Sequence, residues 1–278
     1  MPRLREVHAG ELGRIGSGRE AEVFAWGADR VLRLARSPAL REEIRRECVA
    51  LHAARRCGAP APMAYERIDV DGRPGLVLER LDGHDLLGGL VRRPWELASV
   101  PSVLARLQAS LHDTAAPAEL PDLRAALAAR LESGLVPDDV RDAARDALEA
   151  LPDGDRLLHG DLHPGNVLRR RGDGYVLIDW KAAASGDPAA DVATTRLLLL
   201  EAWIPGLGPR VLQLLLAPAR TLLYAAYRAG YSDRRRIERR AVTRWLPVLA
   251  AARLSYGITQ ERARLLAIAR AGLRDRTA

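Results

Sequence analysis

The 278-residue sequence contains a single asparagine, a single lysine and a single phenylalanine, and only two cysteines. Because one of its 43 basic residues is lysine and all others are arginine, an arginine where chemistry usually requires lysine is weak evidence by itself. The two cysteines, Cys48 and Cys57, are too few for a disulfide framework or a cysteine-based metal site. We expect both to be reduced and partly buried.

Long apolar runs are also missing. The N-terminal residues contain no apolar signal core, and the most apolar stretch, residues 197–227, is interrupted by Glu201, Arg210 and Arg220 and by prolines. We therefore expect a soluble, cytoplasmic protein that does not enter the membrane. Its length and its 48% of hydrophobic residues suffice for one large domain or two modest ones.

The net charge of +7 is unevenly distributed along the chain. From Glu201 onward, fifteen arginines stand against five acidic residues, with the densest run, RRRIERR, at Arg234–Arg240. No aromatic residues are interleaved with this run, as they are in many single-strand nucleic-acid binders. We interpret the run as a solvated helical face and expect no nucleic-acid partner.

The first eighty residues have the pattern of strands around one helix. Residues 12–26 predict two short strands around a glycine-containing turn, and residues 30–35 predict a third. A helix should follow Ser37-Pro38, which supplies an N-cap and a first-turn proline, and end near Gly58. Residues 63–81 predict a hairpin with Asp71-Gly72 at its turn.

The remainder is predominantly helical in pattern. We expect helices over about 84–93, 99–115, 121–133 and 138–150, and several more after residue 188. One β-hairpin interrupts them, with strands near 167–170 and 175–178 around a turn at 172–174. The sequence therefore predicts a strand-rich lobe of residues 1–82 and a larger helical lobe of residues 83–278.

Chemistry-bearing residues gather in the segment LLHGDLHPGNVLRRRGDGYVLID, residues 157–179. Asp161, Asn166 and Asp179 are oxygen donors of the kind that suits Mg²⁺. Asp161 and Asn166 lie in a stretch that contains Pro164 and Gly165, which favours a loop. The hairpin after Asn166 should return Asp179 to the same end of the ladder, so both could reach one metal ion.

Two simpler readings of this segment exist. His159 and His163 are four residues apart, a spacing that forms a zinc pair on one helical face, but Pro164-Gly165 argues against a helix here. His159 is more plausibly a brace of the loop, and His163 a residue that lines the cleft. Any single aspartate could also be a turn-forming or capping residue.

HGDLHPGN followed by IDW has the order and spacing of the catalytic loop and metal-binding aspartate of protein kinases. It resembles still more closely the aminoglycoside phosphotransferase-like family, in which His-Gly-Asp-x-x-x-x-Asn typically precedes Ile-Asp-Trp. The resemblance spans nearly the whole chain. It implies an α+β, bilobal protein-kinase-like fold: a small antiparallel-sheet nucleotide-binding lobe with one main helix, then a mostly helical lobe for catalysis and substrate binding.

The resemblance also implies an activity and roles for residues. The protein would be an ATP-dependent O-phosphotransferase acting on a hydroxyl of a small molecule such as an antibiotic, an amino alcohol or another metabolite. Asp161 would be the catalytic base, and Asn166 and Asp179 would hold Mg²⁺ on the ATP phosphates. Asp191, in the first turn of a helix that Asp187 can cap, would support the catalytic loop, as would His159.

The strand-rich lobe would contribute the nucleotide contacts. Gly16, Ser17 and Gly18 could form the loop over the phosphates, although a plain hairpin turn has the same pattern. The backbone from Glu79 to Leu81 would contact adenine, because this stretch resembles the segment that joins the lobes.

The strand at residues 30–35 carries Arg33 where kinase-like folds have lysine. The following helix has Leu40, Ile44, Glu47 and Leu51 on one stripe. A carboxylate within an apolar stripe is costly unless paired, so we expect an Arg33–Glu47 ion pair. Alternatively, Glu47 lies at the surface edge and binds a neighbouring arginine.

The acceptor is the least determined part of the prediction. His163, Lys181, Glu201 and Trp203 are candidate pocket residues, and the basic C-terminal region favours an acceptor less cationic than typical aminoglycosides. Lys181 could lie near the phosphates or the acceptor, or be a solvated loop lysine. Because Arg33 stands where kinase-like folds have lysine, the protein could alternatively be a weakly active or inactive nucleotide-binding regulatory module.

Overall fold

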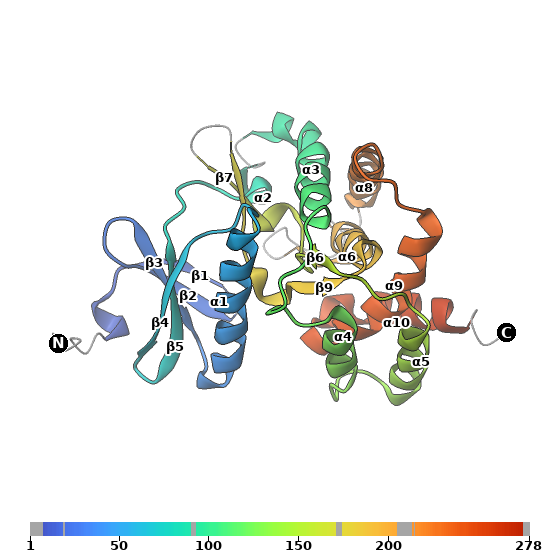
Figure 1. The fold of residues 1–278 in the computed structure, drawn as a ribbon, viewed down its shortest axis with the longest axis horizontal. Helices are drawn as coiled ribbons and strands as arrows, with labels where there is room; N and C mark the ends of the chain where they lie inside the picture. The colour runs from blue at the N-terminus through green and yellow to red at the C-terminus, as the bar shows by residue number, and fades with distance from the viewer. Residues whose placement is uncertain are drawn as a thin grey trace. The chain divides into compact units, whose positions relative to one another are not determined.

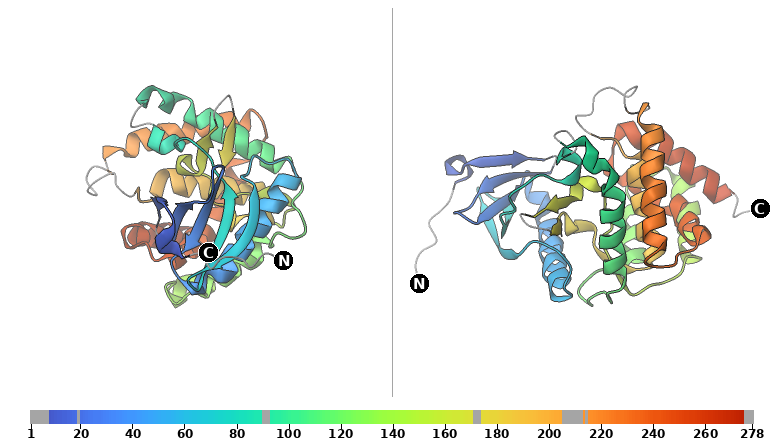
Figure 2. Two further views of the ribbon diagram at one scale, coloured as in Figure 1. Left: turned by 90° about the vertical axis from the view of Figure 1, so that its left-hand side faces the viewer. Right: turned by 90° about the horizontal axis from the view of Figure 1, so that it is seen from above.

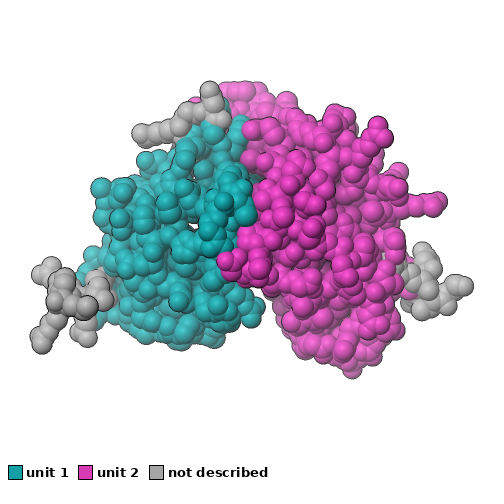
Figure 3. All heavy atoms as spheres, in the orientation of Figure 1, with its two compact units in different colours: residues 1–85, 167–182 teal, residues 86–166, 183–278 magenta. Residues whose placement is uncertain are grey.

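A computed structural model describes residues 8–18, 20–89, 93–170, 174–204, 213 and 215–274. The chain forms two compact units, which Figure 3 shows in separate colours. Unit 1 comprises Met1–Asp85 and Val167–Ala182, and unit 2 comprises Leu86–Asn166 and Ala183–Ala278. The segment Val167–Ala182 groups with unit 1, whereas the sequence predicts it as part of the helical lobe.

Unit 1 is built on a five-stranded antiparallel sheet with the order β1-β2-β3-β5-β4 (Figure 1). The strands are β1 (Arg14–Ser17), β2 (Ala21–Ala25), β3 (Arg30–Ala35), β4 (Ala64–Val70) and β5 (Arg73–Glu79), and the main helix is α1 (Arg41–Arg56). A short 3-10 turn, η1 (Ala9–Glu11), precedes the sheet. These strands and the helix confirm the expected small antiparallel lobe with one main helix.

Local signals account for the boundaries of these elements. The Ser37 side chain accepts a hydrogen bond from the Ala39 amide at 3.2 Å and caps η2 (Pro38–Leu40), which leads into α1. Between β4 and β5, Asp71 and Gly72 both have positive φ angles, 52° and 74°, as a two-residue type I′ hairpin turn requires.

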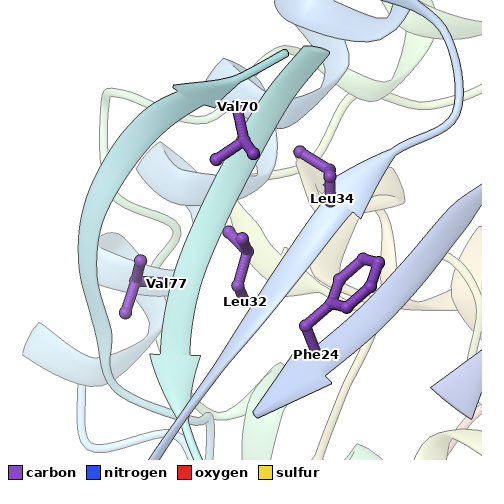
Figure 4. Packing of buried hydrophobic residues seen from close by; sticks show 5 residues of the cluster. All are labelled: Phe24, Leu32, Leu34, Val70 and Val77. Carbon is purple, nitrogen blue, oxygen red and sulfur yellow. The ribbon is translucent and has the colours of Figure 1, made fainter. Parts of the chain in front are cut away.

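The two faces of β3 are used differently. Leu32 and Leu34 are fully buried and pack with Phe24, Val70 and Val77 on one face (Figure 4). Arg33 lies on the opposite face, toward α1, because successive side chains of a strand alternate. The sheet thus has an apolar core on one side and a buried ionic contact on the other.

Unit 1 also contains the predicted hairpin of β7 (Val167–Arg169) and β8 (Tyr175–Leu177), followed by η5 (Trp180–Ala182). The hairpin is tied to the rest of the unit by the Leu177 amide, which donates to the Pro60 carbonyl at 2.7 Å. The expected turn at 172–174 lies mainly outside the described residues.

Unit 2 is helical, as expected, with α3 packed along α8 and α9 packed against α6 and α10 (Figure 2). Its helices are α2 (Leu86–Gly89), α3 (Val100–His112), α4 (Leu123–Leu131), α5 (Asp138–Glu149), α6 (Pro188–Glu201), α8 (Ala217–Ser232), α9 (Arg239–Arg253) and α10 (Thr259–Arg274). The short 3-10 turns are η3 (Pro94–Ala98), η4 (Pro164–Asn166) and η6 (Leu254–Tyr256). Of the helix expected over 84–93, the structure has α2, and residues 90–92 lie outside the described residues.

Two strands of unit 2 were not expected from the sequence. β6 (Arg156–Leu158) and β9 (Ala184–Gly186) form a two-stranded antiparallel ribbon that leads directly into the loop at His159. Among the residues that the structure describes, no helix is both long and apolar enough to cross a membrane.

Candidate active site

The loop after β6 brings Asp161 and Asn166 into contact. The Asn166 side-chain amide donates to the Asp161 carbonyl at 2.8 Å and to Asp161 Oδ2 at 3.1 Å, and the Asn166 backbone amide donates to the His163 carbonyl at 2.9 Å. These bonds use the amide nitrogen of Asn166, so the amide oxygen is the atom that it can offer to a cation. Gly160, with φ of 74°, provides the left-handed backbone that turns the chain after the strand.

Both histidines of the loop bond within the loop. His159 is fully buried and its Nδ1 accepts from the Asp161 amide at 3.3 Å, while His163 Nδ1 accepts from the Gly165 amide at 3.1 Å. Nowhere in the described ranges do three or more His, Cys, Asp or Glu side chains gather to hold a metal ion. The zinc-pair reading therefore gains no support, and His159 braces the loop as expected.

Asp191 holds the same loop from α6. Its Oδ1 accepts from the Gly160 amide at 2.8 Å and its Oδ2 from the His159 amide at 3.2 Å. Asp187 caps the helix by accepting from the Ala189 amide at 2.9 Å, which places Asp191 in the first turn. Asp191 thus makes the hydrogen bonds to the loop backbone that its expected supporting role requires.

His112, which contacts Asp191, and Tyr231, which contacts His112, were not identified from the sequence. His112 on α3 donates from Nε2 to Asp191 Oδ2 at 3.0 Å, and its Nδ1 is hydrogen-bonded to the Tyr231 hydroxyl on α8 at 2.6 Å. Burial alone would raise the pKa of Asp191, but hydrogen bonds from His112 and Gln108 outweigh it and lower that pKa. The sequence signal that could have indicated this contact is the position of His112 among the apolar residues of α3.

Asp179 occupies a strained position in unit 1. The hairpin register pairs Val167 with Leu177, so the residues flanking the hairpin emerge at one end of it, as expected. Asp179 has a left-handed φ of 62°, a backbone conformation that residues other than glycine rarely adopt. Its Oδ1 is buried and has no hydrogen-bond partner among the described residues, which fits a carboxylate that takes a cation.

Lys181 is surrounded by carboxylates within unit 1. Its Nζ lies 2.5 Å from Glu20 Oε2, 3.6 Å from Glu43 Oε1 and 3.9 Å from Asp179 Oδ2, and its side chain is 18% exposed. Burial acts to lower the pKa of Lys181, but the three carboxylates outweigh it and raise that pKa. The reading of Lys181 as a solvated loop residue is therefore wrong.

The ion pair expected between Arg33 and Glu47 is confirmed. The Arg33 guanidinium contacts the Glu47 carboxylate, and the side chains are 18% and 3% exposed. Glu47 projects from the buried stripe of α1, together with Ile44 and Leu51. The alternative of a surface-edge glutamate is excluded, because Glu47 is buried.

The predicted phosphate loop is braced by an arginine that the sequence did not reveal. We call Gly16, Ser17 and Gly18 the glycine turn, and the residue after it, Arg19, lies outside the described residues. Arg36, just past β3, donates from Nε to the Gly18 carbonyl at 3.1 Å and from NH2 to Ser17 Oγ at 2.6 Å. Its position three residues after Arg33 gave no signal of this role.

The segment expected to contact adenine is partly engaged in the sheet. The Glu79 amide donates to the Met63 carbonyl at 2.8 Å, and the Glu79 carboxylate pairs with Arg170 of the β7–β8 hairpin. Leu81 follows β5 and is partly exposed. A nucleotide contact in this segment would therefore be made by backbone groups other than the Glu79 amide.

Two candidate acceptor residues of unit 2, Glu201 and Trp203, are held by contacts that involve arginine–glutamate pairs. Glu201, at the end of α6, binds Arg264 at 2.9 Å. The Trp203 amide donates to Glu261 Oε1 at 2.8 Å, and Glu261, which is 2% exposed, binds Arg253 at 2.7 Å. Burial acts to lower the pKa of Arg253, but the bond with Glu261 and the negative charges, among them that of Asp161, raise it.

Comparison with known proteins identifies the family. The model of the phosphotransferase enzyme family matches residues 11–241. The chain therefore belongs to the phosphotransferase enzyme family, and the resemblance to aminoglycoside phosphotransferase-like proteins is confirmed.

A curated relative matches only part of the chain. A hydroxyurea phosphotransferase of Kitasatospora aureofaciens is 39% identical over 139 residues, which cover 45% of this chain and 39% of that protein. The match thus spans well under half of the relative's length.

Solved structures agree in fold. The choline kinase LicA of Streptococcus pneumoniae superposes with a TM-score of 0.61 at 13% identity, covering 95% of this chain and 93% of that one. The aminoglycoside phosphotransferase APH(4)-Ia gives a TM-score of 0.57 at 19% identity, with the same coverage. These similarities confirm the α+β protein-kinase-like fold.

Proposed function

We propose that the protein is an ATP-dependent O-phosphotransferase that acts on a hydroxyl of a small molecule. The observation that carries this proposal is the loop in which Asp161 contacts Asn166 while Asp191 holds the backbone at His159 and Gly160. A loop fixed by a buried carboxylate can present Asp161 in one orientation, which positional catalysis requires. Family membership supports the same class of reaction.

In this proposal Asp161 is the catalytic base. Its carboxylate accepts the proton of the acceptor hydroxyl as the hydroxyl oxygen attacks the γ-phosphorus of ATP, and ADP leaves. Asn166, through its amide oxygen, and Asp179, through its unpartnered Oδ1, would hold Mg²⁺. The metal would supply neutralisation of the phosphate charge.

Nucleotide binding is assigned to unit 1. The glycine turn would lie over the phosphates, and Arg33, oriented by Glu47, would take the place of the kinase lysine. Solved complexes of APH(4)-Ia contain ADP or AMP-PNP together with hygromycin B, which supports nucleotide binding in proteins of this fold.

Substitution of Asp161 tests the assignment. We expect Asp161→Asn to reduce phosphotransfer by about 10²–10⁴-fold, the usual contribution of a positioned base, because the amide cannot accept the proton. Mg-dependent ATP binding, followed by calorimetry, should stay close to wild type. Phosphotransfer at the wild-type rate in Asp161→Asn would show that another group is the base.

For the acceptor, we propose a neutral or weakly charged alcohol or N-hydroxy compound. Glu201, a candidate pocket residue, and Glu261, which accepts from the Trp203 amide, are both paired with arginines and offer little free negative charge to a polycation. ATP consumption should be screened with hydroxyurea, choline, hygromycin B and a panel of other hydroxylated metabolites. Turnover confined to polycationic aminoglycosides would contradict this acceptor class.

A weakly active or inactive regulatory module is the competing function, because Arg33 replaces the usual lysine. The intact Arg33–Glu47 pair favours activity, since it reproduces the buried ion pair of active kinases. We expect Arg33→Lys to lower phosphotransfer, because arginine's fork is adapted to this site. A large increase in the steady-state rate of Arg33→Lys would instead indicate an impaired site in the natural sequence.

A further inference from the structure

Lys181 is the single lysine of the chain, and its backbone is rigidly placed. The preceding Trp180 is fully buried and its indole N–H donates to the Leu177 carbonyl at 2.7 Å. Ala182, the following residue, is also buried, and η5, which contains all three, packs against α1. Unlike the side chains of its two buried neighbours, the Lys181 side chain, which is 18% exposed, can therefore change its contacts without repacking unit 1.

The ammonium meets carboxylates from three separate segments. Glu20 follows the glycine turn, Glu43 lies in the first turn of α1, and Asp179 is the proposed metal ligand. One ammonium is therefore shared among three carboxylates. A second positive group, such as a divalent cation on Asp179, would compete with Lys181 for these carboxylates and weaken their hold on it.

Among the described residues, two arginines near the proposed phosphate site are already engaged in contacts within unit 1. Arg33 is bound to the buried Glu47, and Arg36 donates to the glycine turn at Ser17 and Gly18. An arginine at position 181 would hold Glu20 through a planar two-pronged contact. A lysine ammonium is a compact point charge on a flexible chain and can exchange one anion for another.

We propose that Lys181 is a phosphate-binding residue of the nucleotide site. Glu20 holds its ammonium in the nucleotide-free protein, and the ATP phosphates take the place of the Glu20 carboxylate when Mg-ATP binds. The inference rests on the proposed function, because it requires that Asp179 and the glycine turn face a nucleotide. It assigns Lys181 to the nucleotide rather than to the acceptor.

Two substitutions with opposite expected effects test this exchange. Lys181→Met should weaken Mg-ATP binding about tenfold, the effect of losing one charge-assisted contact to phosphate. Glu20→Gln removes the anion that competes with the phosphates, so binding should be as tight as in the wild type or tighter. Both dissociation constants are measured by calorimetry at fixed ionic strength.

A third variant controls for the loss of an ion pair as such. Arg41→Met removes an exposed pair of the same unit, in which Arg41 contacts Asp69 at 2.6 and 2.7 Å, and should leave the ATP dissociation constant unchanged. The midpoint of thermal unfolding without nucleotide is recorded for each variant. A loss of ATP binding can then be distinguished from a loss of folded protein.

The outcomes separate the inference from the proposed function. If Lys181→Met binds Mg-ATP as tightly as the wild type, or if Lys181→Met and Glu20→Gln weaken binding equally, Lys181 is a structural brace and the inference fails alone. If the folded wild type binds no Mg-ATP, the proposed function fails with it.

Discussion

At the scale of single residues, the buried carboxylate of Asp191 shows how unit 2 fixes its loop. It is 2% exposed and is met by two backbone amides and by His112, so its burial is compensated by hydrogen bonds. His112 is in turn bonded to Tyr231. Three helices, α3, α6 and α8, thereby contribute to the position of one loop.

This arrangement makes stability depend on pH. The pKa of Asp191 is lowered in the folded protein, so its ionised form stabilises the fold above the unfolded pKa of about 3.9, and this contribution is lost as the pH falls through the lower, folded-state pKa. We expect Asp191→Asn to be less stable than the wild type at neutral pH. The difference should narrow on acidification below about pH 4.

Chemical denaturation at a series of pH values measures this difference. Asp146→Asn, at an exposed position on α5, is the matched control and should follow the wild-type curve. A stability gap between wild type and Asp191→Asn that stays constant down to pH about 2 would show that Asp191 does not titrate in the range given by its lowered pKa.

Contacts between residues could be predicted from the sequence where a local pattern of apolar and charged residues indicated them. The apolar stripe of α1 identified Glu47 as a carboxylate that needs a partner, and the resemblance to kinase-like folds identified Arg33 as that partner. Lys181 and Glu20 are 161 positions apart, so no periodicity relates them, and their contact depends on tertiary packing alone. His112 and Tyr231 were missed for the same reason.

At the scale of elements, capping and turn residues were informative. Ser37 and Asp71-Gly72 mark the boundaries of η2, α1 and the β4–β5 hairpin where the structure has them. β6 and β9 escaped prediction, because three-residue strands are too short to show an alternation of period two. Their pairing is set by contacts with neighbouring elements.

Gly186 shows how closely this ribbon is packed. A Cβ atom on Gly186 would lie 2.8 Å from Leu123 Cβ at the start of α4 and 2.8 Å from Leu158 Cδ1 at the end of β6. Contacts this short require a backbone shift, because Leu123 Cβ is not the end of a flexible chain. We expect Gly186→Ala to lower the free energy of unfolding by about 1–3 kcal/mol.

Urea denaturation of Gly186→Ala measures this loss. Gly134→Ala is the control, since no atom lies within 4 Å of a Cβ built there, and its stability should equal or slightly exceed that of the wild type. Equal stability of Gly186→Ala and wild type would mean that the ribbon can relax away from α4.

At the scale of the whole molecule, the arginine-rich C-terminal region is not simply an excess of surface charge. Arg235 pairs with Asp113 at 2.8 Å, and Arg270 with Asp139 at 3.1 Å, so acids from earlier parts of unit 2 meet the later arginines. Arg234 donates to the Gly230 carbonyl at 2.7 Å at the C-terminal end of α8, where a positive charge is favourable. The run at 234–240 therefore contains structural contacts that composition alone could not reveal.

The path of the chain between the units has a consequence for synthesis on the ribosome. Residues Met1–Asp85 leave the ribosome before Val167–Ala182, which also belong to unit 1 and are translated only after several helices of unit 2. N-terminal domains usually fold as soon as they emerge. Here unit 1 cannot be complete, and Glu20 cannot meet Lys181, until translation has passed residue 181. Nascent chains arrested before the β7–β8 hairpin should expose an incomplete N-terminal unit to chaperones.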